Sequence, residues 1–546
     1  MKIVWPGDRF VRWAGFAVVA LSCVALSSGA AFGRESDDDQ DDDGGKIPLI
    51  VGKAVCGLED HAETGLQGQV PAPLRAAGFK GFNCNLKLVG QSRGDGANWQ
   101  TAEFKDRNGH TCGYHGTAFT TANRTNLGVP VIDITEPRDP TPTGYLTSIS
   151  MLDPWESLKV NAQRQLLAAD NGHNGGGGPE VDIYDVSGDC RTPQLLASVA
   201  VGKADGSTGL AHPVIGHEGS WAPDGLTYYG GDLRYSYTVP GTTATGSGQY
   251  YAVDATDPTH PSLITSWTTN IAGANVHGMS ISDDGNRGYF VSLSGGDPLT
   301  DPTKPATNGL VIYDLSEIQA RAPNPQVRLI SKLLWKDGSG AQHTIPVRID
   351  GKPYVIFVDE AGSGGFSSAA QEQAACAAGL PPFPMARIID IRDETRPKIV
   401  SRLALEIHDP ANCAKVLPDV VGLSGFTYGS HYCSVDNKHN ATTLACGYFN
   451  AGIRVFDIRN PHHPKEIAYY NPAGTTTKST GSNHASQWVA GGPDWCSAQV
   501  HLHIADSHGR QGTLWTTCQD NGLLMLKFEN GVWPFEESST PPGEQN

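Results

Sequence analysis

The sequence predicts an all-β fold, a seven-bladed β-propeller of four-stranded antiparallel blades. Two features repeat along the chain and predict it: a His or Asp residue with a turn residue eight positions later, and an Asp residue inside a β-branched string. They recur together at roughly 40 to 60 residues, a period typical of propellers, in which each blade packs only on its neighbours. Seven repeats therefore indicate seven blades.

The first feature predicts the opening hairpin of each blade. The turn position holds Gly or Asn in six of the seven repeats, and these residues suit the positive φ of a tight turn. We expect each His or Asp to open a first strand, with a second strand after the turn. The pairs are His115 with Asn123, Asp153 with Asn161, His217 with Gly225, His277 with Gly285, His343 with Gly351, His431 with His439, and His501 with Gly509.

The second feature predicts the third strand. An Asp follows β-branched or aromatic residues and precedes another apolar residue, as in PVIDI and VIYDL. In four repeats a Pro-containing turn and a further apolar segment follow, which predicts a fourth strand. The residues of this feature are Asp133, Asp185, Asp254, Asp314, Asp390 and Asp457, with Lys527 in the last repeat.

The Asp-containing third strand followed by a Pro turn resembles the LVIVD repeat family of bacterial secreted β-propellers. The resemblance covers most of residues 107 to 530. The segment from Cys56 to Gln100, with the strings ETGLQGQVP and NCNLKLVGQ, is similar to the lead-in of that family. The resemblance implies the propeller fold but little about function, because the family is defined by its repeat.

The N-terminus has the layout of a cleavable secretory signal. Basic residues precede an apolar run from Ala14 to Leu26, and small residues follow. We therefore expect residues 1–33 to be a signal peptide and the protein to be periplasmic or extracellular. A lipoprotein anchored through Cys23 is the less favoured alternative, because the residues before it fit a lipidation site poorly.

Four further parts follow the signal peptide. We expect an acidic disordered linker over residues 34–46, a lead-in segment packed on the propeller over 47–106, the propeller itself over 107–530, and a disordered tail over 531–546. No later segment reaches ~18 consecutive apolar residues, so no transmembrane segment is expected. A formal net charge of −17 argues against nucleic acid as a partner. We expect a monomer.

Ten cysteines remain after removal of the signal, and an oxidising compartment would allow up to five disulfides. The strongest expected pair is Cys433 with Cys446, on either side of one hairpin, where cross-strand neighbours reach bonding distance. Cys56 with Cys84 and Cys376 with Cys413 are further candidates. The sequence leaves the remaining connectivity open.

The repeated His predicts a metal site. First strands of a propeller surround the central channel, so equivalent positions face one another there. Several convergent imidazoles suit a transition metal ion, here copper, iron or zinc. The candidate ligands are His217, His277, His343, His431 and His501, with His115 and Asp153 further from the ion. His503 is a deeper candidate on the same strand, and Glu218 is expected to point away into the blade interface.

Two functions stay open on this evidence. An open coordination position would support oxidoreductase chemistry on a small-molecule substrate, whereas a closed one would be structural. Alternatively, each His bonds the neighbouring blade's backbone, and the propeller is a non-catalytic scaffold for a protein or glycan ligand. Long connections rich in small and polar residues favour that alternative. They cover residues 236–249, 294–307 and 359–385.

Overall fold

The computed structural model describes residues 50–97, 99–117, 125–172, 178–294, 301, 303–366, 369–421, 426–475, 491–504 and 512–535. The expected signal peptide, the acidic linker, most of the C-terminal tail and the turn residues Asn123 and Gly509 lie outside these residues. Among the helices described, none is long and apolar enough to cross a membrane.

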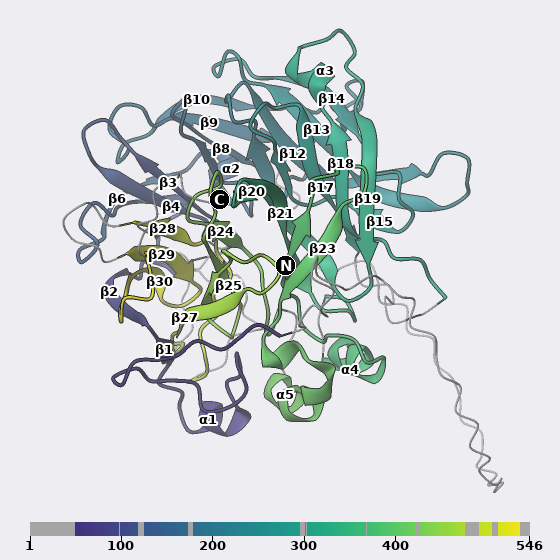
Figure 1. Cartoon of the computed structure of the whole chain (residues 1–546). Coiled ribbons are helices and arrows are strands. Elements are labelled where there is room, and N and C mark those ends of the chain that lie inside the picture. The colour runs from purple at the N-terminus through teal and green to yellow at the C-terminus, as the bar shows by residue number, and fades with distance from the viewer. Residues whose placement is uncertain are drawn as a thin grey trace, which may run out of the picture. The chain divides into compact units, whose positions relative to one another are not determined.

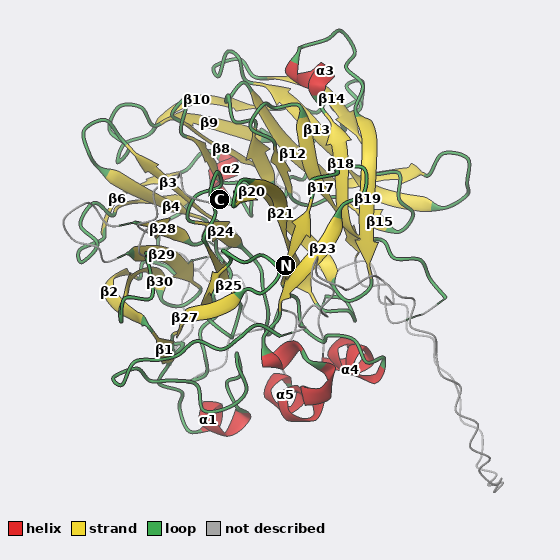
Figure 2. Ribbon diagram, in the orientation of Figure 1, coloured by secondary structure: helices red, strands yellow, loops and turns green. Residues whose placement is uncertain are grey.

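The strands form seven antiparallel sheets arranged in a ring, as Figures 1 and 2 show. The predicted seven-bladed fold is confirmed. Blades one to three consist of β3 (Thr101–Lys105), β4 (Thr111–His115), β5 (Val129–Asp133) and β6 (Thr141–Leu146); β7 (Lys159–Asn161), β8 (Leu166–Asp170), β9 (Val181–Asp185) and β10 (Gln194–Val199); and β11 (Gly219–Trp221), β12 (Thr227–Thr238), β13 (Thr245–Asp254) and β14 (Ser262–Trp267).

Blade four has an additional short strand, and blades one, six and seven each contain a strand from the lead-in. Blades four and five consist of β15 (Ala274–Asn275), β16 (Met279–Ile281), β17 (Arg287–Ser294), β18 (Asn308–Asp314) and β19 (Arg328–Trp335); and β20 (Ser339–Ile349), β21 (Lys352–Ala361), β22 (Ala386–Asp390) and β23 (Lys398–Leu403). Blades six and seven consist of β24 (Cys433–Val435), β25 (Thr443–Gly447), β26 (Ile453–Asp457), β27 (Lys465–Asn471) and β1 (Phe82–Cys84); and β28 (His501–His503), β29 (Thr513–Cys518), β30 (Gly522–Phe528) and β2 (Leu86–Ser92).

Helices are short and lie in the connections between strands (Figure 2). They are α1 (Ala72–Ala76), α2 (Ile149–Leu152), α3 (Ser316–Gln319), α4 (Ala369–Ala377) and α5 (Cys413–Val420), with single 3₁₀ turns at Glu406–His408 and Pro410–Asn412. Apolar side chains fill the space between neighbouring blades. One buried cluster, for example, joins Tyr114 and Leu146 of blade one to Leu167 and Tyr184 of blade two.

The repeated Asp ends the third strand, as predicted, and the structure explains why Asp recurs there. In each of six blades its carboxylate accepts a hydrogen bond from the backbone N–H two residues later, at 2.7–3.0 Å. The side chain therefore forms an Asx turn that directs the chain out of the strand. The residues are Asp133, Asp185, Asp254, Asp314, Asp390 and Asp457.

The position predicted for His115 is wrong. His115 ends β4, the second strand of blade one, and pairs with Thr101 at the start of β3. The turn between these strands is built by Asp106, whose carboxylate accepts the backbone N–H groups of Asn108 and His110. The first hairpin of the ring therefore lies about 15 residues earlier than the repeat predicts, and β3 comes from the lead-in.

The lead-in closes the ring. Strand β2 pairs with β30, with Leu86 opposite Phe528, so blade seven contains strands from both ends of the described chain. Strand β1 extends blade six by pairing with β27. A buried ion pair fixes the same segment: the guanidinium of Arg454 lies 3.0 Å from Glu466 and also contacts Glu63 of the lead-in. The sequence left this closure open.

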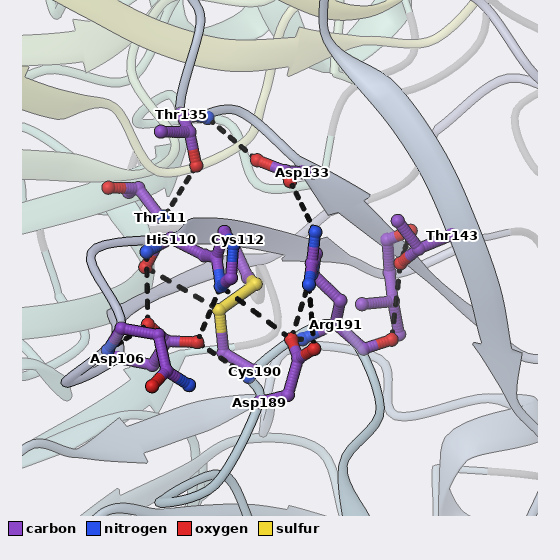
Figure 3. Close-up of a disulfide and its surroundings, with 12 residues drawn as sticks. Asp106, His110, Thr111, Cys112, Asp133, Thr135, Thr143, Asp189, Cys190 and Arg191 are labelled. Atoms are coloured by element: carbon purple, nitrogen blue, oxygen red, sulfur yellow. Dashed lines mark hydrogen bonds and ion pairs between the residues drawn. A yellow bond between two sulfur atoms is a disulfide. The ribbon is translucent and has the colours of Figure 1, made fainter.

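Five disulfides are present, and the three predicted pairs are confirmed. The other two are Cys496–Cys518 and Cys112–Cys190, which links blade one to the turn between β9 and β10 of blade two. Figure 3 shows the second of these with its surrounding ion pairs. Such a disulfide content is typical of a protein that folds in an oxidising compartment.

Candidate functional site

Five side chains meet at the centre of the ring, and we call them the axial cluster: Glu156, His217, His277, Glu360 and His431. Four of them directly precede the first strands of blades two, three, four and six, whereas Glu360 lies near the end of β21. Backbone hydrogen bonds between neighbouring blades align these segments. The N–H of Glu156 donates to the carbonyl of His217 at 2.9 Å.

Glu156 is the one member of the axial cluster that contacts all three of its histidines. Its Oε2 atom lies 3.2 Å from Nε2 of His217 and 3.4 Å from Nε2 of His277, and its Oε1 lies 3.1 Å from Nε2 of His431. Glu360 joins two of the same imidazoles, at 3.6 Å from His277 and 3.3 Å from His431. Three imidazole nitrogens and two carboxylates thus form two compact groups of potential ligands that share Glu156.

Hydrogen bonds outside the cluster orient two of the imidazoles. Nδ1 of His277 lies 3.0 Å from the carbonyl oxygen of Gln342, and Nδ1 of His431 lies 2.9 Å from that of Ser497. A carbonyl only accepts, so each Nδ1 carries a proton and donates it, and Nε2 is left to face the carboxylates. Such outer hydrogen bonds are usual for metal-binding histidines.

Hydrogen bonding within the cluster is incomplete. Both carboxylate oxygens of Glu156 and Nε2 of His277 are buried without a hydrogen-bond partner. Nε2 of His431 lies 3.1 Å from the side-chain nitrogen of Gln342. Buried polar atoms are almost always paired, so unpaired ones at a cluster of this kind point to a group that binds there.

Opposite charges hold the cluster in its ionised form. Burial opposes charge on His277 and His431, but the carboxylates of Glu156 and Glu360 outweigh it and raise the pKa of each imidazole to about 9. Burial likewise disfavours ionised Glu156, yet the three imidazoles keep the pKa of its carboxyl well below the usual range. The pocket is therefore built for cations, either protons or a metal ion.

Aromatic rings enclose the cluster. Trp155 packs on His217 with ring centroids 4.5 Å apart, and Trp99 and Phe449 lie 4.8 and 5.2 Å from His431. The side chain of His217 is 14% exposed, whereas those of the other four residues are at most 4% exposed. The site therefore has one edge nearest to solvent, at His217.

Four predicted ligands lie outside the axial cluster. His343 stacks on Tyr432 at 4.5 Å, with Nε2 3.3 Å from the carbonyl of Cys433. His501 stacks on Trp515 at 4.5 Å, and its Nε2 lies 2.9 Å from the hydroxyl of Thr101. Burial lowers the pKa of His501 to about 4 and that of His343 well below its ordinary value.

The remaining two predicted ligands, His115 and Asp153, make hydrogen bonds with nearby backbone. Nδ1 of His115 lies 2.9 Å from the carbonyl oxygen of Gly116. Asp153 follows α2 and is buried, and its own carbonyl accepts the N–H of Gly172 at 3.0 Å. Among the described residues, none of these four predicted ligands belongs to a group that could hold a metal ion.

Two further predictions concern neighbouring positions. Glu218 does not point away from the channel, because its Oε2 lies 3.6 Å from Nδ1 of His277 and its Oε1 lies 3.5 Å from Nζ of Lys159. His503 bonds Glu103 at 2.7 Å and lies outside the axial cluster. Glu218 therefore neighbours a cluster residue, and His503 does not.

Neither glutamate of the axial cluster was predicted from the sequence. Glu156 occupies in blade two the place that His217 has in blade three, because each lies four residues before the first-strand residue that pairs one position after the start of the second strand, Val160 with Leu167 and Trp221 with Tyr228. The repeat spacing of eight residues, counted from the true turn of blade two, would have identified Glu156. Glu360 lies on a second strand and has no counterpart in the repeat, so no pattern in the sequence marks it.

Two other groups of potential ligands are explained by other bonds. Cys56 and Cys84, near Asp60, form a disulfide. His110 lies 3.1 Å from Asp106 and 3.9 Å from Asp189, and these residues are labelled in Figure 3. Asp189 is already paired with Arg191, a cation, at 2.8 Å. Among the candidate groups found in the described residues, the axial cluster is the one in which buried nitrogen and oxygen atoms make no hydrogen bond.

Fold and cluster together define a seven-bladed β-propeller with a buried group of His and Glu side chains at its centre. No protein-family model matches the chain, so the similarity to the LVIVD family stays a resemblance, and no curated protein matches its sequence. Solved structures do match.

The periplasmic gluconolactonase PpgL of Pseudomonas aeruginosa is 14% identical and aligns over 77% of this chain and 97% of its own, with a TM-score of 0.43. A putative 6-phosphogluconolactonase of Bacteroides fragilis is 12% identical over 75% and 92%, with a TM-score of 0.41. The β-propeller domain of Myceliophteria thermophila Cps50 (Swd1) is 9% identical over 81% and 98%, with a TM-score of 0.43. At these values the similarities say nothing about the chemistry of this chain.

Proposed function

We propose that this protein is an exported propeller of the LVIVD kind whose axial cluster binds one divalent transition-metal ion, the centre of its function. The observation that carries the proposal is the state of His277. Its Nδ1 is committed to a backbone carbonyl, and its Nε2 is buried, makes no hydrogen bond, and lies within 3.4–3.6 Å of two carboxylates. A cation between these atoms satisfies all of them at once.

The donor set selects the type of metal. Imidazole nitrogen suits zinc, copper, iron and nickel, and carboxylate oxygen suits harder divalent ions. Three imidazoles with two carboxylates therefore favour iron(II) or zinc(II), whereas copper(I) prefers the thiolate and thioether ligands that this cluster lacks. Of the three metals expected from the sequence, iron and zinc fit the cluster best.

The first test is elemental analysis of the signal-processed protein, purified without chelators. We expect near-stoichiometric iron or zinc in the native protein and loss of it in the variants His277→Ala and His431→Ala. His501→Ala is the matched control, since this His also begins the first strand of a blade, β28, but stacks on Trp515 outside the axial cluster. Metal-free native protein that also fails to take up either ion on reconstitution would refute the proposal.

The exposed edge at His217 supports small-molecule chemistry at this centre. A ligand reaching an open coordination position would approach on that side, beside the ring of Trp155. The test is O₂ consumption by the iron-loaded protein with a panel of phenols and thiols. Turnover that His277→Ala abolishes supports an oxidoreductase. Bound metal without turnover would make the ion structural and favour the scaffold function.

A further inference from the structure

The two carboxylates of the axial cluster direct their oxygen atoms to different histidines. Oε2 of Glu156 faces Nε2 of His217 at 3.2 Å and Nε2 of His277 at 3.4 Å. Its Oε1 faces Nε2 of His431 at 3.1 Å. Glu360 divides its oxygens in the same way, with Oε1 3.6 Å from His277 and Oε2 3.3 Å from His431. Each carboxylate therefore extends from His277 on one side to His431 on the other.

The histidines belong to two separate groups. The first group is Glu156, His217 and His277, and the second is Glu156, Glu360 and His431; the ligand atoms of each lie within 4.8 Å of one another. Among the described residues, no such group contains His431 together with His217 or His277. Three ligands of one ion, each about 2.1 Å from it, lie within about 4.2 Å of one another. A single ion with three of these ligands therefore does not reach both groups.

The atoms within each group have the spacing of ligands that share an ion. Four ligands arranged tetrahedrally at about 2.0–2.1 Å from an ion lie about 3.3–3.4 Å from one another. Four of the carboxylate-to-imidazole contacts in the axial cluster measure 3.1, 3.2, 3.3 and 3.4 Å. Two of them lie in the first group and two in the second. Each group therefore has the geometry of an ion site of its own.

Gln342 offers a further ligand to the second group. Its side-chain nitrogen lies 3.1 Å from Nε2 of His431, and its side-chain oxygen is buried and makes no hydrogen bond. Rotation of the amide by half a turn exchanges these two atoms. The oxygen then lies beside His431 at the spacing of a shared ion. With one oxygen from each carboxylate, both groups then have four ligand atoms.

We propose that the axial cluster binds a second divalent cation beside the transition-metal ion, with Glu156 and Glu360 bridging the two. The first ion is bound by His217 and His277, and the second by His431 and Gln342. This second site rests on the proposed function, since its bridging carboxylates also bind the first ion. Paired ions of this kind lie about 3.5–4 Å apart.

Titration of the metal-depleted, full-length protein with Co²⁺ counts the ions. We expect each chain to bind two equivalents, measured by elemental analysis after removal of free Co²⁺. Electron paramagnetic resonance tests the bridge. Ions that share bridging carboxylates are magnetically coupled, so the signal per Co²⁺ should decrease when the second equivalent binds.

His217→Ala removes a ligand of the first ion only and should bind one equivalent. The side chain of His217 is 14% exposed, so we expect this variant to fold, and its thermal unfolding checks that it does. His503→Ala is the matched control. This His is also partly exposed and also contacts a glutamate, Glu103 at 2.7 Å, but it lies outside both groups. It should bind two equivalents.

The results distinguish this second ion from the proposed function. Binding of one equivalent by the native protein overturns the second ion and leaves the proposed function standing, whereas binding of none refutes the proposed function. Two equivalents with twice the signal of one overturn the carboxylate bridge. The division into two groups is overturned if folded His217→Ala binds no Co²⁺ or as much as the native protein.

Discussion

Glu156 of blade two lies with its Oε2 3.4 Å from Nε2 of His277 in blade four, across the centre of the ring. The same carboxylate also reaches His217 and His431. One side chain therefore joins its own blade to three others, and removal of its charge should disturb the cluster more than any other single change. This relationship gives the first prediction.

Glu156→Gln should weaken metal binding by more than about 100-fold, beyond the effect usual for residues that only support a ligand. Glu360→Gln should weaken it less, because Glu360 contacts two imidazoles rather than three. Competition with a coloured chelator measures both affinities. Glu103→Gln is the control, since Glu103 pairs with His503 outside the axial cluster. An affinity unchanged in Glu156→Gln contradicts the assignment.

The second prediction concerns the pH dependence of stability. His408 is fully buried, accepts the N–H of Leu405 at Nδ1 and lies 2.8 Å from the carbonyl of Pro384 through Nε2. Burial lowers its pKa to about 4. An unfolded His has a pKa of about 6.5, so the unfolded state binds more protons between these values. Stability is therefore lost as the pH falls from about 6.5 towards 4.

His408→Gln should remove this contribution, because an amide can donate and accept at the same two places without titrating. The slope of unfolding free energy against pH should decrease by up to about 1.4 kcal/mol per pH unit in that window. Urea unfolding at several pH values measures it. If the two proteins have equal slopes from pH 4 to 6.5, His408 is not the neutral group inferred from its bonds.

The third prediction compares two disulfides. Cys112–Cys190 closes a separation of 78 residues, and Cys433–Cys446 one of 13. A cross-link restricts the unfolded chain more when its loop is longer. Replacing Cys112 and Cys190 by Ser should therefore cost about 1–2 kcal/mol more than replacing Cys433 and Cys446. Chemical unfolding of the two double variants measures the difference. A larger cost for the short loop would favour local packing as the main effect.

The fourth prediction tests the repeated Asp. The carboxylate of Asp185 accepts the N–H of Ser187 at 2.7 Å where β9 ends. Asp185→Ala should destabilise the fold by about 1 kcal/mol, and Asp185→Asn by much less, because an amide oxygen still accepts this bond. Thermal unfolding distinguishes the two. Equal losses in both variants would show that the charge, and not the turn, is what matters.

The repeat could predict the fold because the same local chemistry recurs in each blade. A turn residue ends the first hairpin, and an Asx turn ends the third strand, as at Asp254 and Asp457. Both signals are local in sequence. The closure of the ring by β2 is not local, since the partner of Leu86 is Phe528, and no pattern specified it.

The candidate site was predictable only in part, for reasons of register. In blade five the pairing of β20 with β21 shifts between Ala341 and His343, and Gln342, not His343, contacts His431. In blade two the spacing from the turn leads to Asp153, while Glu156 is the residue that contacts the three histidines. A shift of a few residues moves a side chain out of the channel, and sequence spacing alone does not reveal it.

The shared seventh blade makes closure of the ring depend on the last described strand. Strand β2 is the second of the described strands in chain order, and its partner β30 is the last. A chain cut short before Gly522 lacks the strand that pairs with β2, and unpaired strand edges are prone to aggregation. Loss of this one strand therefore opens the ring at a single place and leaves β2 without its partner.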